Sequence, residues 1–87
     1  MDQEPEAPKP KSQPSRIDAA YILKAFTYHA PVGDQAERYS KINAVSAGLA
    51  GTIMYNCPES PERTLAIRCL QEARMWANSS IAINEGV

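Results

Sequence analysis

One short segment constrains the fold of this 87-residue chain most, because a long stretch with helical patterning lies on each side of it: Cys57-Pro58-Glu59-Ser60-Pro61. Ser60 is a residue type that caps helix N-termini, and Pro61 fits the first helical position, where a backbone N–H is not needed. Glu62 places a negative charge beside the positive end of the helix dipole. The segment therefore predicts a turn between two long helices that together span residues 34–84.

Both stretches repeat apolar residues every three to four positions, which is the spacing of one helix face. The first stripe consists of Ile42, Val45, Leu49 and Ile53, and the second of Ala66, Leu70, Ala73, Ala77 and Ile81. Asp34 followed by Glu37 is typical of a capping box. Gly48 and Gly51 each cost about 1 kcal/mol relative to alanine inside a helix, which suggests close packing of another backbone there. Each helix is expected to have about 22–24 residues and a length of about 33–36 Å.

A shorter helix is predicted upstream, from about Ile17 to Phe26, with Ser15 or Asp18 as its N-cap. It carries apolar residues on two sides, so we expect it to pack between neighbours. Pro31 and Gly33 then interrupt the pattern, since a proline disfavours a helical residue before it and a glycine tolerates a positive φ. No alternating run of β-branched residues is present in the sequence. The predicted fold class is therefore all-α, a short N-terminal helix plus a long antiparallel helical hairpin.

Composition divides the chain into a tail and one small domain. Residues 1–15 hold four of the seven prolines and no large apolar residue except Met1, so this tail is expected to be disordered. Residues 16–87 form the expected helical hairpin domain, with seven Lys/Arg and seven Asp/Glu. This balance argues against general DNA binding or attachment to a membrane surface. The chain shows neither an export signal nor an apolar run of about 18 residues, which favours a cytoplasmic protein.

The domain is too small to bury much apolar surface in two helices of one chain. Cys57 and Cys69 are isolated in the sequence, so they predict reduced thiols rather than a disulfide framework or a metal site. No metal and no cofactor is predicted. The expected source of additional stability is assembly into a compact homo-oligomer.

The candidate ligand contacts are aromatic and basic residues. Tyr28 and His29 lie at the break before the hairpin, where a tyrosine ring can stack on a base and an imidazole can donate to a phosphate. A tyrosine in the core and a histidine bonded to a backbone carbonyl are the competing interpretation. Arg38 and Lys41 share a helix face and could grip an anion, as could Arg68 on the second helix; a solvated charged surface is the alternative. A single histidine without a positioned carboxylate argues against nucleophilic catalysis, so no catalytic residue is predicted.

Several segments taken together resemble a known family. They are Phe26-Thr27-Tyr28-His29-Ala30-Pro31, Arg38-Tyr39, Ile42-Asn43, Cys57-Pro58-Glu59-Ser60-Pro61-Glu62-Arg63 and Met75-Trp76-Ala77-Asn78. They are similar to the helical hairpin of phage anti-CBASS proteins, which sequester cyclic oligonucleotides. The phage Thoeris inhibitor, which sequesters a cyclic ADP-ribose signal, contains the same hairpin. The resemblance covers about residues 17 to 84, and the lack of a strand domain favours the anti-CBASS side of the family.

The resemblance implies a hexamer in the cytoplasm of the infected bacterium. It implies pockets between protomers for cyclic dinucleotides, such as cyclic GMP-AMP, and separate pockets for cyclic trinucleotides, with no cleavage of either ligand. By motif position Tyr28 matches the aromatic residue that stacks on a base, and Lys41 is the best candidate for the phosphate contact. The position after Ile42 is often basic in the family but is Asn43 here, and Asn43 is a further candidate contact.

Two other function classes are compatible with the residues alone. A helical-hairpin adaptor would bind a host protein through the surface around Trp76. An enzyme would cleave cyclic nucleotides with His29 as its acid–base group. A sponge releases intact messenger when it is denatured, an enzyme leaves linear products, and an adaptor is not stabilised by the messenger.

The tail is predicted to be dispensable, because its composition supports no packing. A protein beginning near Ser15 should keep the assembly state and the ligand affinity of the full chain, as measured by light scattering and calorimetry. Loss of either property would mean that the tail docks on the hairpin.

Overall fold

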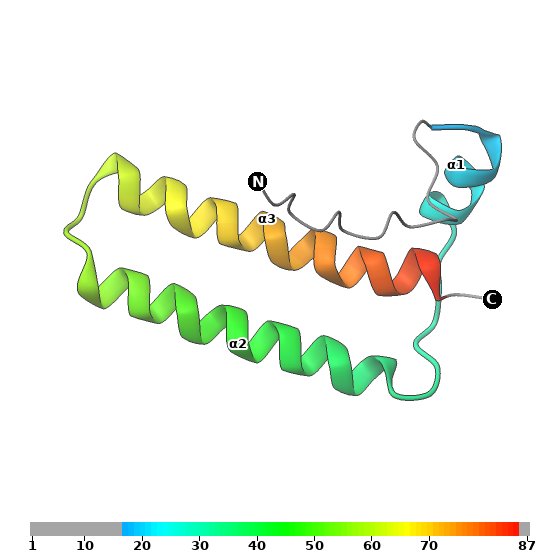
Figure 1. The fold of residues 1–87 in the computed structure, drawn as a ribbon, viewed down its shortest axis with the longest axis horizontal. Helices are drawn as coiled ribbons and strands as arrows, with labels where there is room; N and C mark the ends of the chain where they lie inside the picture. Colours follow the sequence, from blue (N-terminus) through cyan, green and yellow to red (C-terminus); the bar gives the residue numbers. More distant parts are fainter. Residues whose placement is uncertain (1–16, 86–87) are drawn as a thin grey trace, which may run out of the picture.

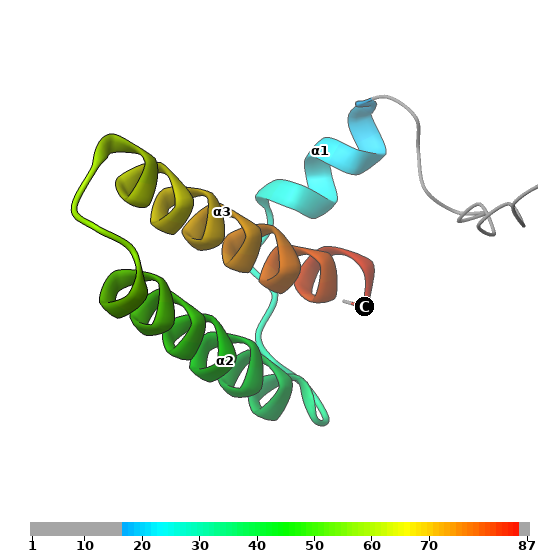
Figure 2. The ribbon, with the colours of Figure 1, turned by 60° about the vertical axis from the view of Figure 1, so that its left-hand side comes forward.

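Three α-helices make up the part of the chain that the computed structural model describes, residues 17–85. They are α1 (Ala19–Phe26), α2 (Gln35–Asn56) and α3 (Pro61–Asn84). Helices α2 and α3 lie side by side and antiparallel, while α1 lies beyond the open end of this hairpin, near the C-terminal end of α3 (Figures 1 and 2). Between residues 17 and 85 there is no strand, so the predicted all-α fold with a helical hairpin is confirmed. The predicted tail, residues 1–15, lies outside the described residues.

The sequence signals at the starts of α1 and α3 are confirmed by hydrogen bonds. The Ser60 hydroxyl accepts from the backbone N–H of Arg63 at 3.1 Å, and Pro61 opens α3. An Asp18 carboxylate oxygen accepts from the N–H of Tyr21 at 2.8 Å, which makes Asp18 the cap of α1. Both cap residues have the extended backbone that lets a short side chain reach back to the first turn.

The predicted capping box at the start of α2 is wrong. The Asp34 backbone is not extended, with φ −91° and ψ 12°, and its side chain makes no cap hydrogen bond. The carboxylate binds Arg38 one turn later instead, with Oδ1 3.2 Å from Nε. Gln35 stabilises the entry to the helix, because its Oε1 accepts from the N–H of Val32 at 3.0 Å. Gly33 just before has φ +57°, the positive value expected from its position.

Little of the hairpin is buried within one chain. Ile81 is the buried apolar residue and Gln35 the buried polar one among the described residues. Toward α3, helix α2 presents half-buried residues with short side chains, such as Ser46 and Ala50, between the larger Ile42 and Ile53. Val45 and Leu49 were predicted in the same stripe, but they are exposed in the single chain. The apolar pattern of α2 therefore serves two surfaces, of which one faces α3 and the other is uncovered.

The expectation that Gly48 and Gly51 admit a closely packed backbone is not met within one chain. A Cβ atom added at either glycine would meet nothing within 4 Å. Helix α1 is similarly uncovered, since Ile22, Leu23 and Phe26 are all exposed, Phe26 to 85%. The neighbours between which α1 was expected to pack are thus not supplied by α2 and α3 of the same chain.

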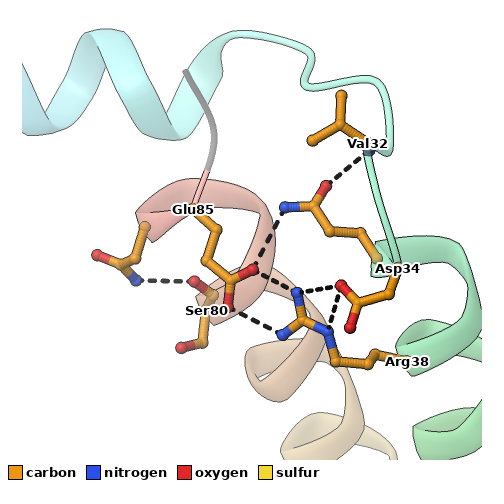
Figure 3. Close-up of polar contacts among 7 residues, drawn as sticks. Val32, Asp34, Arg38, Ser80 and Glu85 are labelled. Atoms are coloured by element: carbon orange, nitrogen blue, oxygen red, sulfur yellow. Dashed lines mark hydrogen bonds and ion pairs between the residues drawn. The ribbon is translucent and has the colours of Figure 1, made fainter.

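An ion pair joins the two helices at the open end of the hairpin (Figure 3). Arg38 Nη1 donates to Glu85 Oε2 at 2.9 Å, and Arg38 Nη2 donates to Glu85 Oε1 at 2.5 Å. Each charge opposes the dipole of its own helix, because Arg38 lies in the first turn of α2 and Glu85 caps the C-terminus of α3. The two charges stabilise the fold only when the N-terminus of α2 and the C-terminus of α3 are close enough for Arg38 and Glu85 to pair. The pair therefore favours the observed alignment of α2 against α3.

The pairing shifts the pKa of both groups. Hydrogen bonds from Arg38 lower the pKa of Glu85, with a smaller lowering by Gln35 and opposition from partial burial. The Arg38 pKa is raised, chiefly by its hydrogen bonds to Glu85. Because the Glu85 pKa is lower in the folded state, its stabilising effect is complete above the ordinary glutamate pKa. This effect is lost as the pH falls through the lowered value.

Replacing Glu85→Gln should lower the melting temperature by a few degrees at about pH 7, a small effect because the pair is partly exposed. The helix dipole alone would predict a higher melting temperature for Glu85→Gln, because the substitution removes a negative charge from a helix C-terminus. The difference from wild type should narrow at a pH below the lowered pKa of Glu85, where its carboxyl is protonated in the folded state as well. Thermal unfolding monitored by circular dichroism at both pH values tests this.

Glu72→Gln is the matched control, because Glu72 is an exposed glutamate of α3 with no ion pair in the described part of the chain. It should melt like wild type at both pH values. An unchanged or raised melting temperature in Glu85→Gln at about pH 7 would show that the pair does not stabilise the hairpin.

Candidate functional site

A groove of about 540 Å³ lies between α2 and α3, in the half of the hairpin nearer its open end. Its lining comes from both helices: Tyr39, Asn43, Arg74, Met75, Asn78, Ser79 and Ala82. Tyr39 and Asn43 are four residues apart on α2, as are Arg74 and Asn78 on α3, so each pair shares one helix face. The groove is shallow and largely open to solvent.

Three polar side chains meet at one atom in this groove. The Asn43 Oδ1 accepts from Arg74 Nη1 at 3.3 Å and from Asn78 Nδ2 at 3.2 Å. The other amide atom of Asn78, Oδ1, is buried and has no hydrogen-bond partner in the described chain. Buried amide oxygens are normally satisfied. The cluster therefore contains one buried acceptor, Asn78 Oδ1, that the described residues leave without a hydrogen bond.

The groove continues along the hairpin as a narrower hollow of about 250 Å³. Asn43 and Arg74 line both parts, and the second part is otherwise walled by Ser46, Ala47, Ala50, Ile67, Leu70 and Gln71. The short side chains of α2 create this space, because they leave room opposite the larger residues of α3. Asn43 and Arg74 thus lie where a polar hollow meets a more apolar one.

Tyr28 and His29 lie in the segment between α1 and α2, at the open end of the hairpin. The Tyr28 side chain is 84% exposed, so within one chain it fills no core position. His29 is half-buried, and its Nε2 lies 2.7 Å from the Lys24 carbonyl oxygen. The contact with a backbone carbonyl matches the competing interpretation for His29, whereas the Tyr28 ring is accessible.

The basic candidates are separated by the structure. Arg38 is bound by Asp34 and Glu85, which leaves its charge compensated. Lys41 is exposed on α2 and, at about 100° per residue, lies on the opposite side of the helix from Asn43. Arg68 is exposed on α3 and, among residues 17–85, forms no ion pair with Glu72 four positions later. Of the six candidates only Asn43 lines the groove.

Sequence reasoning missed the position of Arg74. One signal was present, because Arg74 has no acidic residue three or four positions away on α3, while Arg68 has Glu72 at that spacing. The contact between Arg74 and Asn43 could not be predicted in the same way. It joins residues 31 positions apart and depends on the alignment of α2 against α3.

Neither a membrane span nor a metal cluster is found among residues 17–85. No helix there is long and apolar enough to cross a bilayer. The same residues contain no group of three or more His, Cys, Asp and Glu side chains that could hold a metal ion.

Comparison with known proteins identifies the family. The model of the Acb2/Tad1 hairpin domain matches residues 18–82, which cover α1, α2 and most of α3. No curated protein and no solved structure matches the chain. This family is known for a phage anti-defence role as a sponge and is associated with binding cyclic oligonucleotide signals. With a match over far more than half of its length, the chain belongs to the Acb2/Tad1 hairpin domain family.

Proposed function

We propose that this protein is a non-enzymatic sponge that blocks CBASS signalling in the cytoplasm of the phage-infected cell. It binds cyclic di- and trinucleotide messengers without cleaving them and keeps their free concentration too low to activate the effector. The observation that carries this proposal is the match of residues 18–82 to the Acb2/Tad1 hairpin domain. A cyclic ADP-ribose type signal is the alternative ligand, because the family also includes the anti-Thoeris proteins.

The working form of the sponge is a homo-oligomer, with six copies expected from the resemblance. Large apolar side chains are exposed on all three helices, among them Phe26, Val45, Leu49, Leu65 and Trp76. A hairpin that buries so little cannot offset the entropy lost on ordering its chain. Other copies would cover these surfaces, and symmetry would then supply each pocket residue more than once.

Dinucleotide binding is assigned to Tyr28 and Lys41 of neighbouring copies. The exposed Tyr28 ring offers a face for a base, and Lys41 has no ion pair within the described part of the chain. His29, Asn43 and Arg68 are secondary candidates. Arg38 is the weakest, because a phosphate would have to displace two carboxylates from it. Two rings and two ammonium groups around a ligand with two phosphates would bind tightly without a net basic domain.

A host-protein adaptor is the second candidate function, and the exposure of Trp76 favours it. Its side chain is 61% exposed on α3, with Met75 beside it 53% exposed. Tryptophan on an open surface is frequent at protein–protein contacts. The same exposure is expected of a residue that meets another copy of this chain, so the oligomeric state separates the two explanations.

Light scattering should give a mass several times the 9.5 kDa of one chain, with a six-fold multiple expected. The physical reason is that exposed apolar surface of this extent favours association. The measurement is made on the full chain at micromolar concentration. A monodisperse monomer would contradict the assembly and would favour the adaptor.

Tyr28→Ala should weaken binding of cyclic GMP-AMP by about 1–3 kcal/mol for each stacked base, while Tyr28→Phe should cost much less because the ring remains. Lys41→Ala should weaken the same binding and flatten its salt dependence. Calorimetry measures both effects. If trinucleotides occupy separate pockets, binding of a cyclic trinucleotide should survive Tyr28→Ala.

Tyr55→Ala is the matched control, since Tyr55 is 82% exposed at the far end of α2. It should bind cyclic GMP-AMP like wild type. Unchanged affinity in Tyr28→Ala would remove the stacking role. Recovery of intact messenger after heat denaturation distinguishes the sponge from a nuclease, and a thermal-shift screen that includes cyclic ADP-ribose tests the alternative ligand.

A further inference from the structure

We propose that the groove between α2 and α3 is a nucleotide-binding subsite in which Arg74 contacts a phosphate and Tyr39 packs against the attached sugar or base. The identity of the ligand rests on the proposed function. The inference adds a cation that the sequence motifs do not assign and places it in a hollow formed by one protomer.

Arg74 is the uncompensated cation of this groove. Among the basic residues of the described chain, Arg38 is held by two carboxylates, and Arg63 donates to the carbonyl oxygens of Met54 and Cys57. Arg74 is half-buried and within residues 17–85 it bonds to one neutral atom, Asn43 Oδ1. A guanidinium has five N–H donors in a fixed fork, so most of its donors remain available. An anion is the group that such a site lacks.

The neighbouring amides of Asn43 and Asn78 leave one free donor group and one buried acceptor in the described structure. The one accepting atom at the centre of the cluster, Asn43 Oδ1, already receives two hydrogen bonds. The Asn43 Nδ2 makes no hydrogen bond in the described structure and is the next donor along the groove wall. Asn78 Oδ1 is the one buried acceptor without a partner among the described residues, and the free N–H donors of Arg74 and Asn43 outnumber it, so a ligand rich in oxygen acceptors fits the groove best. Planar guanidinium groups match phosphate oxygens in pairs, which makes a phosphate the favoured anion.

The remaining walls suit the rest of a nucleotide. Tyr39 is half-buried and lines the groove one helical turn before Asn43. Met75 and Ala82 supply apolar surface on the α3 side. Aromatic and apolar walls around a few convergent polar groups are typical of small-molecule sites. A bare inorganic anion would leave these walls unused, so the class of ligand is a phosphate that carries a base and a sugar.

Three variants test the assignment by calorimetry with cyclic GMP-AMP. Arg74→Gln keeps a polar side chain but removes the charge, and it should weaken binding by about tenfold or more and flatten the salt dependence. Asn43→Asp is nearly isosteric and places a carboxylate beside Arg74. It should raise or preserve the melting temperature through the new ion pair and yet weaken binding, a combination that a purely structural role does not produce. Lys24→Gln, which removes a charge from α1, is the control and should bind like wild type.

Each other outcome is decisive. Unchanged affinity in Arg74→Gln overturns the groove assignment while the sponge function stands. A lower assembly mass in Arg74→Gln by light scattering places the groove in a contact between copies and also overturns the assignment. If wild type binds no cyclic nucleotide, the proposed function fails. A thermal-shift assay with 5′-AMP then tests separately whether the groove binds a nucleotide. A rise in melting temperature that Arg74→Gln abolishes supports the subsite, and no rise in wild type overturns it.

Discussion

In a hairpin of two antiparallel helices, each helix can bury only the one face that it turns toward the other. The remaining faces of both helices stay exposed unless another molecule covers them. In the described chain Ile81 is the single buried apolar residue, and it still keeps 9% of its surface exposed. The apolar residues of α2 are divided between the face toward α3 and an outer face with Val45 and Leu49. A small domain of this kind gains too little from burial to offset its conformational entropy alone. The uncovered apolar surface is therefore available for contact with a partner, and the proposed assembly of further copies would cover it.

The polar contacts at the open end connect this architecture to the segment that bears Tyr28. The N–H of Val32 donates to Gln35 Oε1, and Gln35 Nε2 lies 3.5 Å from Glu85 Oε1, which also accepts from Arg38. One network therefore ties the loop before α2, the first turn of α2 and the end of α3 (Figure 3). The loop is short, and His29 is bonded to the carbonyl oxygen of Lys24 at its other end. Tyr28 consequently lies in a segment that is held on both sides, so the proposed stacking of a base on Tyr28 would cost less conformational entropy than in a free loop.

The sequence was a good guide wherever the determinant is local. The Ser60 and Asp18 caps, the proline at the start of α3 and the positive φ of Gly33 each depend on residues within one turn. The exception is the capping box at Asp34, which failed although its determinant is local, because the Asp34 backbone is not extended and its carboxylate binds Arg38 one turn later. Arg74 escaped notice because its contact with Asn43 exists only after α2 and α3 are aligned. The assembly state and the residues of the ligand pockets stay predictions, because both depend on contacts beyond one chain.

The exposed apolar side chains and the polar cluster around Arg74 are stabilised by different kinds of neighbour. Apolar side chains such as Trp76 are stabilised by any close-packed apolar neighbour. The Arg74 cluster is not, because an apolar cover would strip water from a guanidinium and leave it without an anion, which costs several kcal/mol. A neighbouring copy that encloses the groove would also lower the local dielectric and strengthen attraction between Arg74 and a phosphate. If the proposed assembly and the proposed subsite both form, association of the hairpins and capture of an anionic ligand at Arg74 should therefore reinforce each other, although the domain as a whole is formally neutral.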